Sequence, residues 1–192
     1  MNDKRSLRAD LKRQRSEIPA EVSSRADRLI AERVTACGFY KNTNALLIYI
    51  SSQIEVGTGG ILSRAFEDGK TVYAPRCIKG TNEMVFCRIT SLDDLECGSW
   101  GIFEPRQYCE EYKGSENALC ITPALAYDTE GYRLGFGKGY YDRFLSGFRG
   151  RRLGICYDSF ILESVFRDSF DVPVELIITE NREIIIDDER EE

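Results

Sequence analysis

The segment with the densest chemical signal is Arg133–Arg143, which reads RLGFGKGYYDR. Three alternate glycines surround Lys138 and lead into a stretch with helical periodicity. Glycine lets the backbone turn with positive φ and approach a ligand closely, and the start of a helix offers unpaired N–H groups. Together with the mobile charge of Lys138, these groups favour an anion. The segment therefore predicts a phosphate-binding loop.

Two common phosphate-binding motifs do not match this loop. It contains no G-K-[ST], so it is not a Walker A motif, and its glycines lack the G-x-G-x-x-G spacing of dinucleotide folds. A tight connection with Lys138 lying along the surface explains the spacing equally well. Asp142, in the first helical turn, either stabilises the helix dipole or ligates magnesium.

A second cationic feature lies near the start of the chain. The spacing of Leu7 and Leu11 predicts a helix that ends near Ser16. At about 100° per residue, four basic side chains fall within an arc of roughly 80° beside the leucines, namely Lys4, Arg8, Lys12 and Arg15. This basic edge is either a solvated face or an anion-binding surface, and periodicity alone favours the solvated face.

The chain contains no histidine, so the commonest general base and the commonest zinc ligand are both missing. Acid–base chemistry must therefore use carboxylates, lysine or tyrosine. The seven cysteines include no C-x-x-C pair and their number is odd, which argues against a disulfide framework or a zinc cage. We expect free thiols in a reducing compartment.

Apolar patterning predicts the elements that must position these groups. The expected helices span residues 2–16, 20–36, 58–66, 140–145 and 161–166, and the expected strands span residues 45–50, 71–74, 84–89, 118–121, 152–156 and 176–179. Pro75 and Pro123 are expected to end two strands, and residues 187–192 to fray. The alternation predicts one α/β domain over residues 1–192, a three-layer, Rossmann-like sandwich with a mostly parallel sheet flanked by helices. We expect the site at the carboxyl ends of its strands.

Composition limits the classes of protein and partner. At 192 residues, with 42% hydrophobic and 30% charged residues, the chain has the composition of a single globular domain. Its 26 basic and 32 acidic residues give a net charge of −6, which argues against a protein that coats nucleic acid. No apolar run reaches the ~18 residues of a membrane span, and the first residues lack a signal-peptide pattern. We expect a cytoplasmic monomer, with an organellar form left open, without nucleic-acid or membrane partners.

Taken together, the motifs resemble the 5-formyltetrahydrofolate cyclo-ligase family, also called 5,10-methenyltetrahydrofolate synthetases. The resemblance is strongest in the spacing D-x-x-G-x-R-L-G-x-G-K-G-Y-Y-D-R, which runs from Asp128 to Arg143. Shorter matching segments are residues 4–8, 49–58, 75–76, 122–128, 172–174 and 177–180. The resemblance therefore covers nearly the whole chain.

The resemblance implies an ATP-dependent ring closure in folate one-carbon metabolism. The formyl oxygen of 5-formyltetrahydrofolate is phosphorylated, the neighbouring amine attacks the activated carbon, and phosphate leaves. The products are 5,10-methenyltetrahydrofolate, ADP and phosphate. Phosphoryl transfer depends on positioning and charge neutralisation more than on a histidine base, so a chain without histidine can perform it.

By resemblance, two segments bind ATP. The implied ATP-binding positions are Lys4, Arg5, Ser6, Leu7, Arg8, Arg133, Leu134, Gly135, Phe136, Gly137, Lys138, Gly139, Tyr140 and Tyr141. Lys138 and Arg133 are the implied catalytic residues, with Lys138 neutralising charge in the transition state. Asp142 matches a position that binds Mg²⁺, and Glu175 stands where family members usually have a second, aspartate ligand.

The resemblance also implies positions that bind the folate. These are Ile50, Glu55, Trp100, Phe136, Gly137, Lys138, Gly139 and Tyr140. The carboxylate of Glu55 would accept hydrogen bonds from the amino and ring N–H groups of the pterin. Trp100 either stacks on a flat ring or anchors its loop. Arg76 would meet the glutamate tail of the folate or be solvated at the surface.

Two other functions stay open at this point. The glycine-rich loop alone is compatible with an α/β enzyme that acts on a sugar phosphate. The basic first helix is compatible with a non-catalytic nucleotide- or RNA-binding protein, although the net charge of −6 argues against it.

Overall fold

The computed structural model describes residues 4–98 and 101–186, so Trp100 and residues 187–192 lie outside the described residues. The α-helices are α1 (Lys4–Ser16), α2 (Ala20–Ala36), α3 (Gly38–Lys41), α4 (Gly59–Glu67) and α5 (Tyr140–Leu145). The strands are β1 (Ala45–Ile48), β2 (Thr71–Cys77), β3 (Met84–Ile89), β4 (Leu95–Cys97), β5 (Phe103–Pro105), β6 (Ala118–Thr122), β7 (Ala126–Asp128), β8 (Arg133–Leu134), β9 (Arg151–Ile155), β10 (Ile161–Leu162), β11 (Leu176–Ile178) and β12 (Glu183–Ile185). Within the described ranges, no helix has the length and apolar character needed to cross a membrane.

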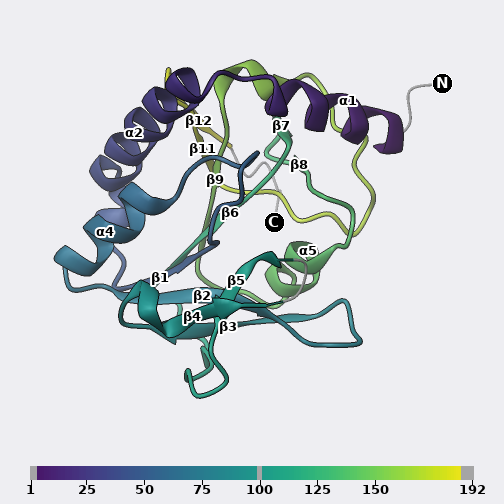
Figure 1. The fold of residues 1–192 in the computed structure, drawn as a ribbon. Helices are drawn as coiled ribbons and strands as arrows, with labels where there is room; N and C mark the ends of the chain where they lie inside the picture. Colours follow the sequence, from purple (N-terminus) through teal and green to yellow (C-terminus); the bar gives the residue numbers. More distant parts are fainter. Residues whose placement is uncertain (1–3, 99–100, 187–192) are drawn as a thin grey trace, which may run out of the picture.

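A seven-stranded sheet forms the centre of the fold, in the order β12-β11-β9-β6-β1-β2-β3. The five inner strands run parallel, and the edge strands β3 and β12 are antiparallel to their neighbours. Two small sheets, β10-β7-β8 and β4-β5, are added to it. The mostly parallel sheet between helices confirms the predicted α/β class (Figure 1).

The central strands are covered on both faces. Leu46 and Ile48 of β1 belong to the core that includes side chains of α2 and α4, whereas Leu47 packs in a second core with Leu145 of α5. Figure 1 shows α2 and α4 on one side of these strands and α5 on the other. Burial on both faces explains why β1 reads as a continuous apolar run in the sequence.

The prediction that Pro75 ends its strand was wrong. Strand β2 continues to Cys77, and Pro75 pairs with Phe86 of β3. The neighbouring β1 pairs only with residues 71–73 of β2, so on that side no ladder hydrogen bond requires the N–H that Pro75 lacks.

The helix predicted for residues 161–166 was also wrong. Residues Ile161–Leu162 form β10, which pairs in parallel with β7, and Val165 donates its N–H to Asp128 Oδ2 at 3.4 Å. Phe166 has a φ of 56°, in the left-handed region that a right-handed helix does not use. Pairing with β7 therefore overrides the local helical periodicity.

Candidate active site

The glycine-rich loop joins β8 to α5 and needs glycine at two positions. Gly137 has a φ of 101°, and Gly139, directly before α5, has a φ of 70°. Residues with a side chain rarely adopt this conformation. The loop therefore makes the left-handed turns that the glycine spacing predicts, and Phe136, Gly137 and Lys138 are exposed within it.

Helix α1 contacts this loop through its basic side chains. Arg8 Nε donates to the carbonyl oxygen of Gly135 at 3.0 Å, and Lys12 Nζ lies 5.2 Å from the centre of the Phe136 ring. A Cβ atom at Gly137 would lie 3.5 Å from Arg8 Cζ. The structure thus brings together the two segments that the resemblance assigns to ATP.

The other predicted residues of α1 have different surroundings. Lys4 Nζ donates to the carboxylates of Asp168 at 2.5 Å and Asp171 at 3.0 Å. Arg5 and Ser6 are exposed, whereas Leu7 packs against the main core. Lys4 is therefore tied to the loop before β11, and Leu7 anchors the helix.

Arg133 and Asp142 form an ion pair inside the protein. The guanidinium of Arg133, a buried residue, contacts the Asp142 carboxylate and donates through Nη1 to the carbonyl oxygen of Val172 at 2.9 Å. The Asp142 carboxylate also accepts the N–H of Val172 at 3.4 Å. The pair therefore joins β8, α5 and the segment before β11, and it orients the first turn of α5.

Lys138 lies beside a cavity of about 410 Å³. The cavity is lined by residues 77–82, at the turn between β2 and β3, and by Lys138 and Tyr140. Arg143 Nη1 donates to the carbonyl oxygens of Lys138 at 2.8 Å and of Asn82 at 3.3 Å. Arg143 therefore ties the glycine-rich loop to this turn, a role that its position in the motif does not predict.

Glu55 lies in a tight turn after β1, at the carboxyl end of the sheet. Its Oε2 accepts the N–H of Ser52 at 2.7 Å, and its own N–H donates to the Ser52 carbonyl at 3.2 Å. Burial raises the pKa of Glu55, and the hydrogen bonds from Ser52 and the charge of Arg15 oppose this shift. Ile50, also predicted to bind folate, is half-buried against the main core.

Tyr141, in the first turn of α5, packs against both hydrophobic cores of the protein. Its hydroxyl is buried and has no hydrogen-bond partner among the residues the structure describes. Burial raises the pKa of Tyr141, and the negative charge of Glu55 adds to the shift. Native proteins rarely leave a buried donor unpaired, so this hydroxyl is an exception that calls for an explanation.

Glu175 is held by arginines at the start of β9. Its Oε1 accepts Arg151 Nη1 at 2.8 Å, and its Oε2 accepts the backbone N–H of Arg152 at 2.7 Å. Residues 4–98 and 101–186 contain no group of three or more His, Cys, Asp or Glu side chains arranged around a metal. Asp142 accepts a hydrogen bond from Val172, and Glu175 lies three residues after Val172 in the same segment before β11. Their role in binding a metal stays a prediction.

Two further predicted contacts are less informative. Arg76 donates to the carbonyl of Arg106 at 3.1 Å and to the carboxylate of Glu111 at 3.1 Å, so it binds within the protein. Trp100 lies outside the described residues.

The fold and the site are those of an α/β enzyme with a glycine-rich loop at the carboxyl ends of a parallel sheet. A family model described as the 5-formyltetrahydrofolate cyclo-ligase family matches residues 1–180. The chain belongs to this family, which confirms the predicted resemblance. It is a ligase of folate metabolism.

Relatives and solved structures agree with this assignment. The 5-formyltetrahydrofolate cyclo-ligase of Mus musculus is 35% identical over 150 residues, which cover 74% of this chain and 73% of the mouse protein. The probable 5-formyltetrahydrofolate cyclo-ligase of Caenorhabditis elegans is 28% identical over 197 residues, 96% of each chain. The NMR structure of Aquifex aeolicus 5,10-methenyltetrahydrofolate synthetase matches with a TM-score of 0.85 and 28% identity, over 98% of this chain and 95% of the other.

Proposed function

We propose that this enzyme closes the ring of 5-formyltetrahydrofolate with ATP. The formyl oxygen attacks the γ-phosphorus, a P–O bond forms, and ADP leaves. The neighbouring amine nitrogen then attacks the activated formyl carbon and loses its proton, the C–O bond to phosphate breaks, and the proton leaves with the released phosphate. One ATP and one 5-formyltetrahydrofolate yield one 5,10-methenyltetrahydrofolate, one ADP and one phosphate.

The contact between Arg8 and Gly135 carries this proposal. It fixes a cationic helix against the exposed Gly137–Lys138 turn, so the positive charge of Arg8 lies beside the backbone of this turn. Such an arrangement suits the terminal phosphates of a nucleotide, because phosphoryl transfer is catalysed mainly by positioning and electrostatic stabilisation. Lys138 neutralises the charge that develops on the transferred phosphoryl group.

Glu55 and Tyr141 supply the other half of the proposed site. The Glu55 carboxylate accepts hydrogen bonds from the amino and ring N–H groups of the pterin, and a bidentate pair of this kind selects the heterocycle. The buried Tyr141 hydroxyl, which has no partner among the described residues, would donate a hydrogen bond to the bound substrate. Arg133 holds Asp142 and α5 in place beside the loop.

The donor set fits a magnesium ion that arrives with the nucleotide. Mg²⁺ is commonly held by one or two carboxylates, with substrate phosphates and water completing its shell, so an all-protein cage is not needed. Asp142 would hold it, and Glu175 would join only by exchanging its contacts with Arg151 and Arg152. When bound, the ion neutralises phosphate charge.

The deciding experiment is a coupled assay with purified protein, 5-formyltetrahydrofolate, ATP and MgCl₂. We expect methenyl absorbance to rise with one ADP formed per product, and no rise without ATP or with EDTA present. A chain that hydrolyses a sugar phosphate, or binds RNA without consuming ATP, and forms no methenyl product would contradict the proposal. Size-exclusion chromatography tests the accompanying expectation of a monomer.

A further inference from the structure

The side chain of Arg15 is buried beneath α1 and connects the ends of three neighbouring strands. Its Nη1 donates to the Ile54 carbonyl at 2.9 Å, its Nε to the Leu125 carbonyl at 3.0 Å, and its Nη2 to Cys156 Sγ at 3.3 Å. The three acceptors lie in the segments that come after β1, β6 and β9 in the chain. The Arg15 residue is buried, with only 3% of its surface exposed. One guanidinium therefore spans the edge of the sheet where the site lies.

All the acceptors that Arg15 contacts are uncharged. Among the described residues no carboxylate pairs with it, and its remaining contacts are with the rings of Phe160 and Tyr157, 4.7 and 5.3 Å from its Cζ. Burying a charge without a paired counter-charge is costly. A leucine or methionine would anchor α1 at lower cost, so the retained charge points to a function in the site.

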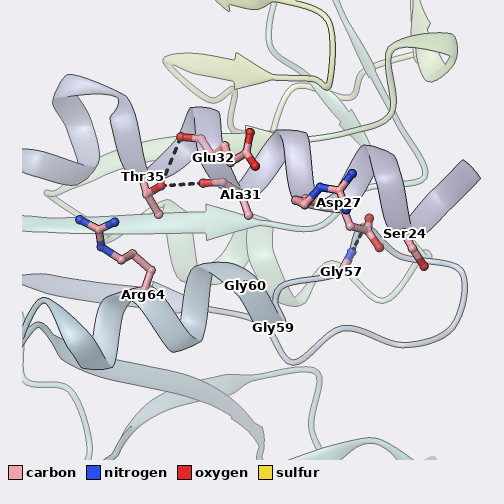
Figure 2. Close-up of a pocket in the computed structure, with 10 residues that line it drawn as sticks. Ser24, Asp27, Ala31, Glu32, Thr35, Gly57, Gly59, Gly60 and Arg64 are labelled. Atoms are coloured by element: carbon pink, nitrogen blue, oxygen red, sulfur yellow. Dashed lines mark hydrogen bonds between the residues drawn. The ribbon is translucent and has the colours of Figure 1, made fainter. Parts of the chain in front are cut away.

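The turn that carries Glu55 is held from both sides. Arg15 binds the carbonyl of Ile54, the residue directly before Glu55. On the other side, Asp27 of α2 accepts the N–H of Gly57 at 2.9 Å, a bond visible in Figure 2, and also the hydroxyl of Tyr157 at 2.9 Å. Tyr157 in turn lies against Arg15, so both supports belong to one network.

We propose that Arg15 is the positioning residue of Glu55: it fixes the turn through the Ile54 carbonyl, so that the Glu55 carboxylate is held in place to bind the pterin. The inference rests on the proposed function. Burial raises the pKa of Glu55; the hydrogen bonds from Ser52 oppose that shift most, and the positive charge of Arg15 opposes it to a smaller extent. Among the residues that the structure describes, the other titratable side chains that interact with Glu55 are Tyr49 and Tyr141. Burial raises the pKa of both, so they stay neutral.

The test compares Arg15→Met with Arg13→Met, a matched control on the exposed side of the same helix. Calorimetry with 5-formyltetrahydrofolate and, separately, with ATP and MgCl₂ gives the two affinities. We expect Arg15→Met to weaken folate binding about 10-fold or more, the loss typical of a charge-assisted contact, and to change ATP affinity less than about 2-fold. Arg13→Met should change neither.

Two additional readouts separate positioning from simple anchoring of α1. The pH below which folate affinity declines should be higher in Arg15→Met than in the wild type, and Arg15→Lys should restore part of that difference because it restores the charge. In a double-mutant cycle, the folate losses of Arg15→Met and Glu55→Gln should be less than additive. If Arg15→Met does not fold, Arg15→Lys replaces it in the test. We then expect a smaller loss of folate affinity, again with little change in ATP affinity.

Three results would overturn the inference. Equal losses of ATP and folate affinity would mean that Arg15 only anchors α1, and unchanged folate affinity or additive losses would mean that it does not act through Glu55. In these cases the wild type still binds folate, and the proposed function stands. A wild-type protein that does not bind 5-formyltetrahydrofolate would overturn both proposals.

Discussion

Arg8 Nε donates to the Gly135 carbonyl at 3.0 Å, although the two residues are 127 positions apart in the chain. The same guanidinium lies close to the open side of Gly137, where a Cβ atom would be 3.5 Å from Arg8 Cζ. Helix α1 and the glycine-rich loop therefore act as one unit. A change in the loop backbone should therefore shift the position of the Arg8 guanidinium, and this shift should weaken nucleotide binding.

Gly137→Ala tests the loop backbone. At a φ of 101° an alanine is strained by about 1–3 kcal/mol, so we expect a higher KM for ATP and a lower turnover. Gly147→Ala is the matched control, because a Cβ there meets nothing within 4 Å. Steady-state kinetics and thermal unfolding of both variants check this. Equal KM values for ATP in Gly137→Ala and the wild type would show that the loop does not bind the nucleotide.

Lys138→Ala tests charge stabilisation in the transition state. We expect kcat to fall by about 30- to 1000-fold, equivalent to roughly 2–4 kcal/mol of barrier, as for other preorganised electrostatic groups. The exposed Lys113 provides the control, and Lys113→Ala should keep wild-type kcat. Single-turnover kinetics, with circular dichroism to check folding, measure the effect. A folded Lys138→Ala enzyme with full activity would rule out the role.

Tyr141→Phe and Tyr127→Phe should change stability in opposite directions. The Tyr141 hydroxyl is buried without a partner among the described residues, so its removal should stabilise the free protein by about 1 kcal/mol. The Tyr127 hydroxyl lies 2.6 Å from the hydroxyl of Thr122 and 3.0 Å from its carbonyl oxygen, so its loss should cost about 1 kcal/mol. Urea unfolding measures both values. If both variants are equally destabilised, Tyr141 has a partner in the free protein.

Tyr141→Phe should also weaken substrate binding if the ligand uses that hydroxyl. The expected pattern is therefore a more stable protein with a higher KM. A variant that is more stable and has an unchanged KM for both substrates would show that neither ligand bonds to Tyr141.

Glu55 should make stability depend on pH. Because burial raises its pKa above the unfolded value, the folded state holds the proton more tightly, and stability falls as pH rises between the two values. Glu55→Gln removes this dependence, so it should be more stable than the wild type at pH 7, with no difference below about pH 4. It should also bind 5-formyltetrahydrofolate more weakly. Urea unfolding across this pH range provides the measurement, and a Glu55→Gln protein less stable than the wild type at pH 7 would contradict it.

Local patterns in the sequence determined the elements and the loop. Helices α2 and α5 and strand β3 have the predicted bounds, because apolar periodicity and the residues that interrupt it act within a few positions. The glycine spacing around Lys138 predicted a turn that only glycine tolerates, and Gly137 and Gly139 adopt it. The motif from Asp128 to Arg143, together with the shorter matching segments along the chain, predicted the family, and the family model that matches residues 1–180 confirms it.

Pairing between distant segments decided what local patterns could not. Residues 161–162 form a strand because β7 offers them backbone partners, and Glu175 is held by Arg151 and Arg152 because β9 and β11 are neighbours in the sheet. The sequence places Arg15 four residues after the buried Leu11, on the same face of α1, yet its charge favours solvent. The tertiary structure buries it because the carbonyls of Ile54 and Leu125 converge at the ends of β1 and β6, and only that convergence makes a buried guanidinium tolerable.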